Sequence, residues 1–397
     1  RYWRDWSSDV CSSDLASSTI RPKRSWSPRN SPVINSTPRR ARSSCEPTNC
    51  ADEGHFPPGT GSAGRVEGMT TASGKRILIT GMGSQLGSLV ASSLESETWV
   101  ADIAGLDIDP PRRRLNRSTF HMIHPSDLVG RTAIIKDFNP HVIIHLSVWE
   151  PDARVNAKQA EHLTQQSAET LFVAAKRASA LEHLVIRSGI EVYGRGNDRP
   201  GSPDETTSMR PTSQYGRMLM YLEHAADRAF NGTRIGVTSL RLAPVVGPHV
   251  PSPLGRLLRL PVVPFNALRP PTFNLLHESD AARAFVLAAR RRPGTPINVV
   301  ADGSVSGFGV IRRGHRLPLP IIGPEWSVTR RIAHLLGAPV PEHVMELLHH
   351  GRRATSVACL EHLGWEPDLS TADVIDALFS WEGIVRVPAQ RQWEVAS

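Results

Sequence analysis

The feature that most restricts the fold is a glycine-rich turn between an apolar run and a segment with helical periodicity. The run Arg76–Thr80 (RILIT) has the branched apolar residues typical of a buried strand. TGMGSQLG follows it, and the apolar residues of Leu86–Leu94 then recur at helical spacing. A strand, a tight glycine turn and a helix in this order predict the first βα unit of a parallel sheet.

The same alternation continues along the chain. Further strand-like runs occupy residues 99–106, 119–123, 141–146, 183–187 and 235–242, and from residue 123 on helical segments separate them. This pattern predicts an α/β fold with a Rossmann-type, doubly wound parallel sheet over residues 75–247. After residue 247 the alternation gives way to a Pro-rich apolar loop and mixed elements. We therefore expect a smaller C-terminal domain over residues 248–385.

Residues 1–74 differ from the rest of the chain. They are dense in Ser, Pro, Arg, Thr and Gly and show no sustained periodicity. Such a composition buries too little apolar surface to offset the entropy lost on ordering, which predicts a disordered tail. Its opening, RYWRDWSSDVCSSDL, resembles translated sequencing-adapter text, and Met69 is a candidate natural start. A basic disordered arm is the alternative.

Composition excludes several classes of function. The formal charge is +8, but the basic residues are scattered and form no recognisable nucleic-acid module, so we expect no nucleic-acid partner. No apolar run approaches the length of a membrane span. Three of the four cysteines lie in the tail, which leaves Cys359 as a single thiol and indicates a reducing, cytoplasmic compartment. The histidines and cysteines match no metal-ligand spacing, so no metal is expected.

The glycine turn has the properties of a dinucleotide site. Gly81 can form the tight turn and Gly87 the close contact of helix and strand, while the helix N-terminus attracts a pyrophosphate. Asp107 ends the second strand, where a carboxylate accepts both ribose hydroxyls and repels a 2′-phosphate. NAD is therefore the expected cofactor. NADP remains an alternative cofactor, because Arg112–Arg114 lie close to this position in the sequence.

A series of motifs resembles one family, in the order in which that family carries them. They are TGMGSQLG, LDID, HLSV, SGIEVYG, RPTSQYGR, LRLAPVVGP, LLHESDAARA and HLGWEPDLST. Residues 75–378 thus resemble an extended short-chain dehydrogenase/reductase of the NAD-dependent epimerase/dehydratase group. They are most similar to a bacterial subgroup described as UDP-glucose 4-epimerases whose members often lack parts of the active site. The resemblance implies a nucleotide-sugar substrate held by the C-terminal region and a transient transfer of hydride to NAD.

The resemblance also implies the positions that bind the cofactor. They are Gly81, Gly83, Ser84, Gln85, Leu86 and Gly87 at the pyrophosphate, Asp107 and Ile108 at the ribose, Asp127 and Leu128 at the adenine, and Leu146, Ser147, Val148 and Tyr215 near the nicotinamide ribose. The family usually has Gly at the position of Ser84 and a small residue at that of Gly83. The middle glycine is thus displaced by one position.

The catalytic positions depart further from the family. Tyr215 matches the family's acid/base tyrosine, but the lysine that normally follows four residues later is replaced by Leu219. Such a lysine lowers the tyrosine pKa through its charge. Arg217 is two residues along, about 200° around the helix, and does not face the same way.

The family's Ser or Thr is also missing. Its position, four residues before Tyr193, is occupied by Gly189, and Ser188 precedes it. Ser188 is retained as the second catalytic candidate, although a shift of one residue on a strand reverses the direction of the side chain. The family's Asn aligns with Thr164.

Other polar residues near this loop are candidates for the substrate site. Glu191, Tyr193 and Arg241 are candidate substrate contacts, and Glu191 or Arg187 could supply a missing acid, base or oxyanion partner. Ion pairing or packing is the structural alternative for each. Two functions remain open: a nucleotide-sugar epimerase, dehydratase or reductase with Tyr215 as proton acceptor, or a catalytically impaired NAD-binding sensor or scaffold. A homodimer is a further expectation from the resemblance.

Overall fold

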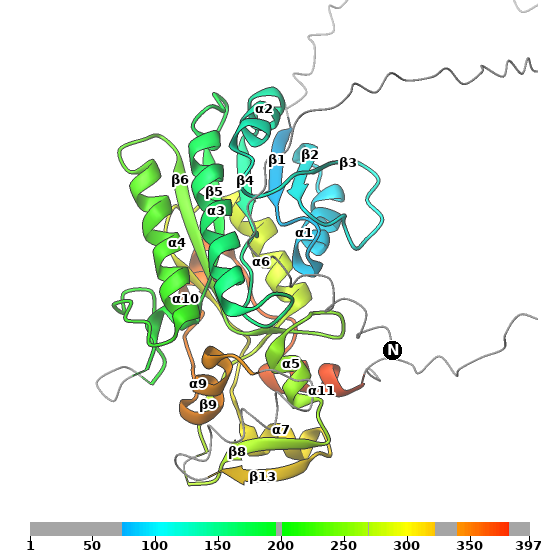
Figure 1. Ribbon diagram of the computed structural model, residues 1–397, viewed down its shortest axis with the longest axis vertical. Helices are drawn as coiled ribbons and strands as arrows, with labels where there is room; N and C mark the ends of the chain where they lie inside the picture. The colour runs from blue at the N-terminus through cyan, green and yellow to red at the C-terminus, as the bar shows by residue number, and fades with distance from the viewer. Residues whose placement is uncertain (1–73, 196–200, 269, 322–339, 381–397) are drawn as a thin grey trace, which may run out of the picture. The chain divides into compact units, whose positions relative to one another are not determined.

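The computed structural model describes residues 74–195, 201–268, 270–321 and 340–380 (Figure 1). The predicted N-terminal tail lies almost entirely outside these residues. Apart from two consecutive strands at Val100–Asp107 and Ser118–Met122, the described elements of the first half alternate between strand and helix, as the sequence predicts (Figure 1).

One parallel sheet organises the described chain. Its seven strands follow the order β11-β6-β5-β4-β1-β2-β3, and every neighbouring pair is parallel. The strands are β1 (Lys75–Thr80), β2 (Val100–Asp107), β3 (Ser118–Met122), β4 (Val142–His145), β5 (His183–Gly189), β6 (Gly236–Leu242) and β11 (Ile297–Val299). The order reverses between β1 and β4, and at such a switch point the carboxyl ends of the strands open a crevice. The prediction of a doubly wound Rossmann-type sheet is confirmed.

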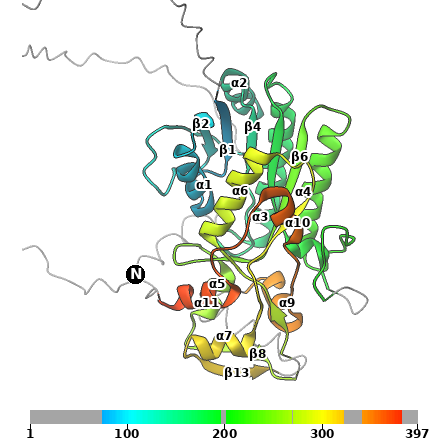
Figure 2. The same cartoon turned by 180° about the vertical axis from the view of Figure 1, so that it is seen from behind.

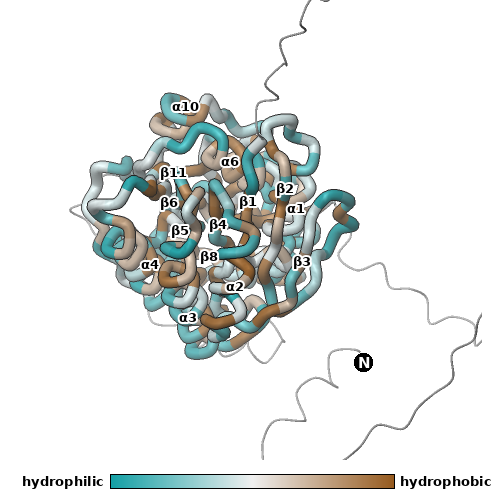
Figure 3. Tube along the Cα trace, turned by 90° about the horizontal axis from the view of Figure 1, so that it is seen from above, coloured by the Kyte–Doolittle hydropathy of each residue, from teal (hydrophilic) through white to brown (hydrophobic). Residues whose placement is uncertain are grey.

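Helices cover both faces of the sheet. One face carries α2 (Leu128–Phe138), α3 (Ala157–Ala175) and α4 (Gln214–Phe230), which pack against one another in that order. The other carries α1 (Gln85–Glu95) and α6 (Glu278–Arg291), joined by α10 (Val357–Leu363), as seen from behind in Figure 2. Figure 3 shows the strands between α6 and the α2–α4 layer. Both faces are covered, and the central strands β1, β4 and β5 are accordingly rich in Ile, Leu and Val with buried side chains, whereas the edge strand β3 has no buried residue.

The C-terminal elements form a second apolar cluster. It involves α5 (Pro253–Leu258), β8 (Val262–Asn266), α7 (Gly307–Arg313), β13 (Leu317–Ile321), α9 (Glu342–His350) and α11 (Thr371–Ser380). Short pairs link these elements: β7 (Val245–Val246) with β10 (Leu276–His277), and β9 (Thr272–Phe273) with β12 (Val305–Ser306).

The chain returns to the main sheet after residue 247. Both α6 and β11 follow that position, yet α6 packs on α1 and β11 forms the edge of the sheet beside β6. The division at residue 247 stays a prediction, and these two elements show that the large and small clusters interleave in sequence. Within the described ranges, no helix combines the length and the apolar content needed to cross a bilayer.

Candidate active site

The glycine turn after β1 is packed too tightly for side chains. Gly81 has a positive φ of 79°, and a Cβ there would lie 2.7 Å from the carbonyl carbon of Leu146, which follows β4. A Cβ on Gly83 would overlap the carbonyl oxygen of Asp109. Position 83 therefore has no room for a side chain, because the loop after β2 lies directly against it. This explains the glycine that is displaced by one position in the motif.

The helix that follows presents its N-terminus to a cavity. Ser84 caps α1: its Oγ accepts a hydrogen bond from the Gly87 N–H at 2.9 Å and donates one to the Gly81 carbonyl at 2.8 Å. Gln85 and Leu86 line the cavity, and their N–H groups have no acceptor among the described residues. Unpaired N–H groups at the positive end of a helix dipole suit a pyrophosphate.

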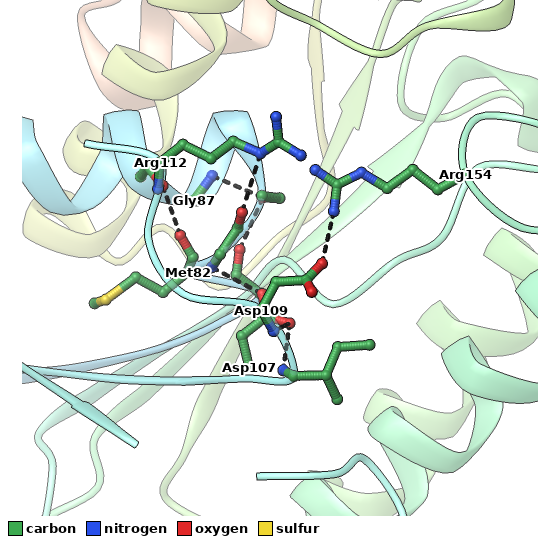
Figure 4. A network of polar contacts seen from close by, with 11 residues as sticks. Met82, Gly87, Asp107, Asp109, Arg112 and Arg154 are labelled. Atoms are coloured by element: carbon green, nitrogen blue, oxygen red, sulfur yellow. Dashed lines mark hydrogen bonds and ion pairs between the residues drawn. The ribbon is translucent and has the colours of Figure 1, made fainter. Parts of the chain in front are cut away.

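Asp107 lies beside this turn at the end of β2 (Figure 4). Its Oδ2 accepts the Gly83 N–H at 2.8 Å, and its Oδ1 accepts the Ile108 N–H at 2.7 Å. Burial raises the pKa of Asp107, while these backbone hydrogen bonds oppose the shift. The carboxylate is thus held in one orientation at the cavity wall, where remaining lone pairs can accept hydroxyl groups.

An ion pair links the two loops beside Asp107. The Asp109 carboxylate lies 2.9 Å from Nη1 of Arg154, which belongs to the segment after β4 (Figure 4). Arg112 donates from Nε to the Gly83 carbonyl at 3.3 Å and from its backbone N–H to Ser88 Oγ at 2.8 Å. Asp109 and Arg154 both line the cavity.

Most of the residues predicted to bind the cofactor meet at this cavity. Its lining includes Gly81, Ser84, Gln85, Leu86, Asp107, Leu146, Ser147 and Val148. The predicted residues outside this lining are Gly83, Gly87, Ile108, Asp127, Leu128 and Tyr215. Asp127 instead caps α2 by accepting the Gly130 N–H at 2.8 Å. The glycine cradle, the free N–H groups and the oriented carboxylate together fit NAD.

A second cavity contains Tyr215 and shares Glu150, Arg187 and Val245 with the first. Tyr215 lies in the first turn of α4, which Ser213 caps, and its side chain is buried. Burial raises the pKa of the Tyr215 phenol well above its usual value. The positive charge and hydrogen bond of Arg187 oppose this shift, whereas the carboxylates of Glu150 and Glu191 reinforce it.

The two positions that depart from the family contact each other. Leu219 is fully buried, and its Cδ1 would lie 3.1 Å from a Cβ on Gly189. The same Cβ would overlap Oε2 of Glu191, whose Oε1 lies 3.4 Å from Nη1 of the buried Arg352. Arg217 is exposed and donates to the Thr212 carbonyl at 2.8 Å. The cation beside Tyr215 is therefore Arg187, from β5.

Three other predicted site residues belong to one buried network. Ser188 Oγ donates to Glu223 Oε1 at 2.5 Å, and the same carboxylate pairs with Arg241 at 2.7 Å. Arg241 Nη1 donates to the Tyr193 hydroxyl at 3.0 Å, which in turn donates to Asn298 Oδ1 at 2.7 Å. The polar atoms of Ser188, Tyr193 and Arg241 are thus paired within the fold, and none makes a hydrogen bond to Tyr215.

Sequence reasoning missed Glu150 and His343. The His343 ring, on α9, lies against Tyr215 with its centroid 4.6 Å away, and its Nε2 lies 3.2 Å from Glu150 Oε1. Glu150 lies two residues after the predicted stretch Leu146–Val148, so its position shortly after β4 could have identified it from the sequence. Nothing in the local sequence of His343 connects it with a residue so distant along the chain.

Comparison with known proteins agrees with this geometry. A protein of Mycobacterium tuberculosis described as uncharacterised is 28% identical over 336 residues, covering 81% of this chain and 88% of its own length. The dTDP-L-rhamnose 4-epimerase of Burkholderia thailandensis is 24% identical over 364 residues, covering 78% of this chain and 95% of its own length.

A solved structure shares the fold. The UDP-glucose 4-epimerase of Thermotoga maritima, determined with UDP-glucose, superposes with a TM-score of 0.59 at 16% identity and covers 77% of this chain and 98% of its own. The model of the NAD dependent epimerase/dehydratase family matches residues 77–300, which is more than half of the chain. This match confirms the expected cofactor, NAD, and the resemblance drawn from the motifs. The chain belongs to the NAD-dependent epimerase/dehydratase family.

Proposed function

We propose that this protein epimerises or dehydrates a nucleotide sugar, with UDP-glucose as the first candidate substrate. The observation that carries the proposal is the position of Arg187, which lines both cavities and lies close enough to Tyr215 for its positive charge to oppose the rise in the phenol pKa. The first cavity has the features of a dinucleotide site, and the second lies next to it with a phenol, a guanidinium and carboxylates. When bound, NAD would supply the hydride acceptor and donor of the reaction.

The nucleotide-sugar class is supported by what the similar proteins act on or bind. One relative is a dTDP-L-rhamnose 4-epimerase, and the Thermotoga maritima structure contains UDP-glucose. Both substrates pair a nucleoside diphosphate with a hexose. The described residues of the second cavity offer groups for the sugar end of such a molecule.

The chain's own residues have separate tasks in this proposal. The Gln85 and Leu86 N–H groups hold the pyrophosphate, and Asp107 accepts the ribose hydroxyls. Tyr215 stays protonated at neutral pH because its pKa is raised, so its hydroxyl donates a hydrogen bond to the reacting sugar oxygen. Arg187 stabilises negative charge that develops on that oxygen, which is a task the family's lysine would otherwise share.

The test combines binding with turnover. Native mass spectrometry of the purified protein would show a co-purifying dinucleotide or sugar nucleotide, and also whether the chain is a homodimer. Interconversion of UDP-glucose and UDP-galactose, and of dTDP-hexoses, would then be followed by chromatography. We expect Tyr215→Phe and Arg187→Ala each to reduce turnover by about 10²-fold or more.

The matched control is Arg217→Ala, which removes an exposed arginine from the same region of α4 and should leave turnover unchanged. Tight NAD binding without turnover of any nucleotide sugar would contradict the proposal. It would support the sensor or scaffold function instead, for which Leu219 and Gly189 are the motivating residues.

A further inference from the structure

His343 has a defined place in the second cavity. It belongs to α9, its side chain is only 5% exposed, and its ring is tilted by 38° to that of Tyr215. The cavity wall contains His343, Tyr215, Arg187 and Glu150. An imidazole and a phenol therefore lie side by side at the place where the substrate's reacting end is proposed to bind.

The two ring nitrogens of His343 have different surroundings. Nε2 lies 3.2 Å from Oε1 of Glu150, and an ionised carboxylate can only accept, so Nε2 carries the proton. Nδ1 is then an acceptor. It is buried and has no hydrogen-bond partner among the described residues. A buried polar atom left unpaired costs free energy, which is the situation expected of an atom reserved for a ligand.

The proposed reaction needs a proton acceptor that Tyr215 does not supply. Oxidation of a sugar hydroxyl releases its proton, and the buried phenol already carries one at neutral pH because its pKa is raised. No lysine stands at position 219 to favour the phenolate. The base must therefore come from another group facing the cavity.

We propose that His343, oriented by Glu150, is the general base of this site and accepts the proton of the reacting sugar hydroxyl at Nδ1. The inference rests on the proposed function. In the oxidation the O–H bond breaks and an Nδ1–H bond forms, while the electron pair of the C–H bond leaves with the hydride to NAD. Reduction reverses both transfers, and the proton returns from Nδ1 to oxygen. The Glu150 carboxylate stabilises the imidazolium that exists between the two steps.

Several charged or titratable groups lie around the imidazole. From other elements they are Glu150 after β4, Arg187 on β5, Glu191 in the 3-10 helix η1 (Ile190–Tyr193), and Tyr215 on α4; on α9 itself they are Glu342 and Glu346. Glu191 and Glu346 are both paired with Arg352. Glu150 is the carboxylate in contact with the ring, so its replacement is the most specific perturbation.

The first experiment measures turnover and binding separately. His343→Asn should lower kcat by about 10²-fold or more, whereas the dissociation constants of NADH and UDP change less than about threefold. Glu150→Gln should move the acidic limb of the kcat/KM profile to lower pH, because the imidazolium loses its stabilising charge. The control is His362→Ala, an exposed histidine on α10. Full activity of a folded His343→Asn variant would overturn the inference.

A second experiment does not depend on turnover. Nitrogen-15 spectra of the intact protein, with the His343 signals identified by their loss in His343→Asn, report which ring nitrogen is protonated. We expect protonated Nε2 and unprotonated Nδ1 at neutral pH, and a lower titration midpoint in Glu150→Gln. A protonated Nδ1, or a midpoint unchanged in Glu150→Gln, would overturn the inference. If these spectra agree but the wild-type protein converts no nucleotide sugar, the proposed function fails while the assigned proton position stands.

Discussion

The carboxylate of Glu191 fills the space in which a side chain on Gly189 would begin. A Cβ at position 189 would overlap Glu191 Oε2 and approach Leu219 Cδ1 to 3.1 Å. The positions of the family's missing hydroxyl and missing lysine therefore lie against each other. The volume that they would share is occupied by Glu191 and Leu219, and Arg187 supplies the positive charge.

Gly189→Ser alone should destabilise the protein by about 1–3 kcal/mol, because it overpacks this volume. Adding Glu191→Ala should relieve part of that loss, since the overlapping carboxylate is removed. The triple variant with Leu219→Lys restores the family's residues around Tyr215, and its turnover should exceed that of the double variant. Denaturant unfolding and the hexose interconversion assay measure both effects. A Gly189→Ser variant as stable as wild type would contradict the packing argument.

Gly81→Ala tests the glycine turn. Alanine must adopt the positive φ of 79°, and its Cβ would also crowd the Leu146 carbonyl, so NADH affinity and stability should both fall. Gly232→Ala is a matched control, because Gly232 has a φ of 72° but nothing within 4 Å of its Cβ position. The control should lose only about 1–2 kcal/mol from backbone strain. Equal losses of stability in both variants would show that crowding at Leu146 does not contribute to the free energy of unfolding.

Asp107→Ala should weaken NADH binding by about 1.5–3 kcal/mol, the usual contribution of hydrogen bonds to a charged group. NADPH should lose less affinity, or gain some, because the carboxylate no longer repels the 2′-phosphate. Fluorescence titration with both dinucleotides provides the measurement. An equal loss of affinity for NADH and NADPH would mean that Asp107 acts only by holding the Gly83 N–H.

Glu223→Ala should destabilise the protein by about 3–5 kcal/mol, because it leaves the Arg241 guanidinium buried without its charge partner. Ser188→Ala should cost only about 1 kcal/mol, since Glu223 keeps its bonds to Arg241. Replacing both ionic partners, as Glu223→Leu with Arg241→Met, should recover much of the loss. Denaturant unfolding ranks the variants, and a mild Glu223→Ala phenotype would argue against a structural role for the pair.

Two buried histidines predict a loss of stability in acid. Burial lowers the pKa of His145 to about 3 and that of His183 to about 4, with Arg131 and Arg292 respectively adding to the shift. The unfolded chain, with histidine pKa values near 6.5, then binds more protons than the folded one. Their stabilisation is complete above that pH and is lost as the pH falls toward 4, by roughly 3 kcal/mol in total at pH 5.5.

Denaturant unfolding at pH 7.5 and 5.5 measures this loss. His183→Gln removes one of the two titrating groups, so the drop between these pH values should shrink by about half, or about 1 kcal/mol. The Gln amide can still bond Thr238, which the His183 ring contacts at 2.9 Å. An unchanged drop would show that His183 does not control acid stability.

The sequence by itself determined the sheet, the cofactor and the departures from the family's usual catalytic residues. Short runs of branched apolar residues, most of them separated by helical segments, predict the buried strands of a parallel sheet. The turn at Gly81, with Asp107 twenty residues after Gly87, follows from local backbone requirements. The replacement at Leu219 is visible because one helical turn places residues 215 and 219 on the same face.

Only the tertiary structure decided what stands in place of the missing groups. Arg187 meets Tyr215 because β5 and α4 pack side by side, and Ser188 points into the network of Glu223 because strand neighbours face opposite ways. His343 reaches the same cavity from α9, far along the chain. Such a contact depends on how two apolar clusters pack together, and no local spacing encodes it.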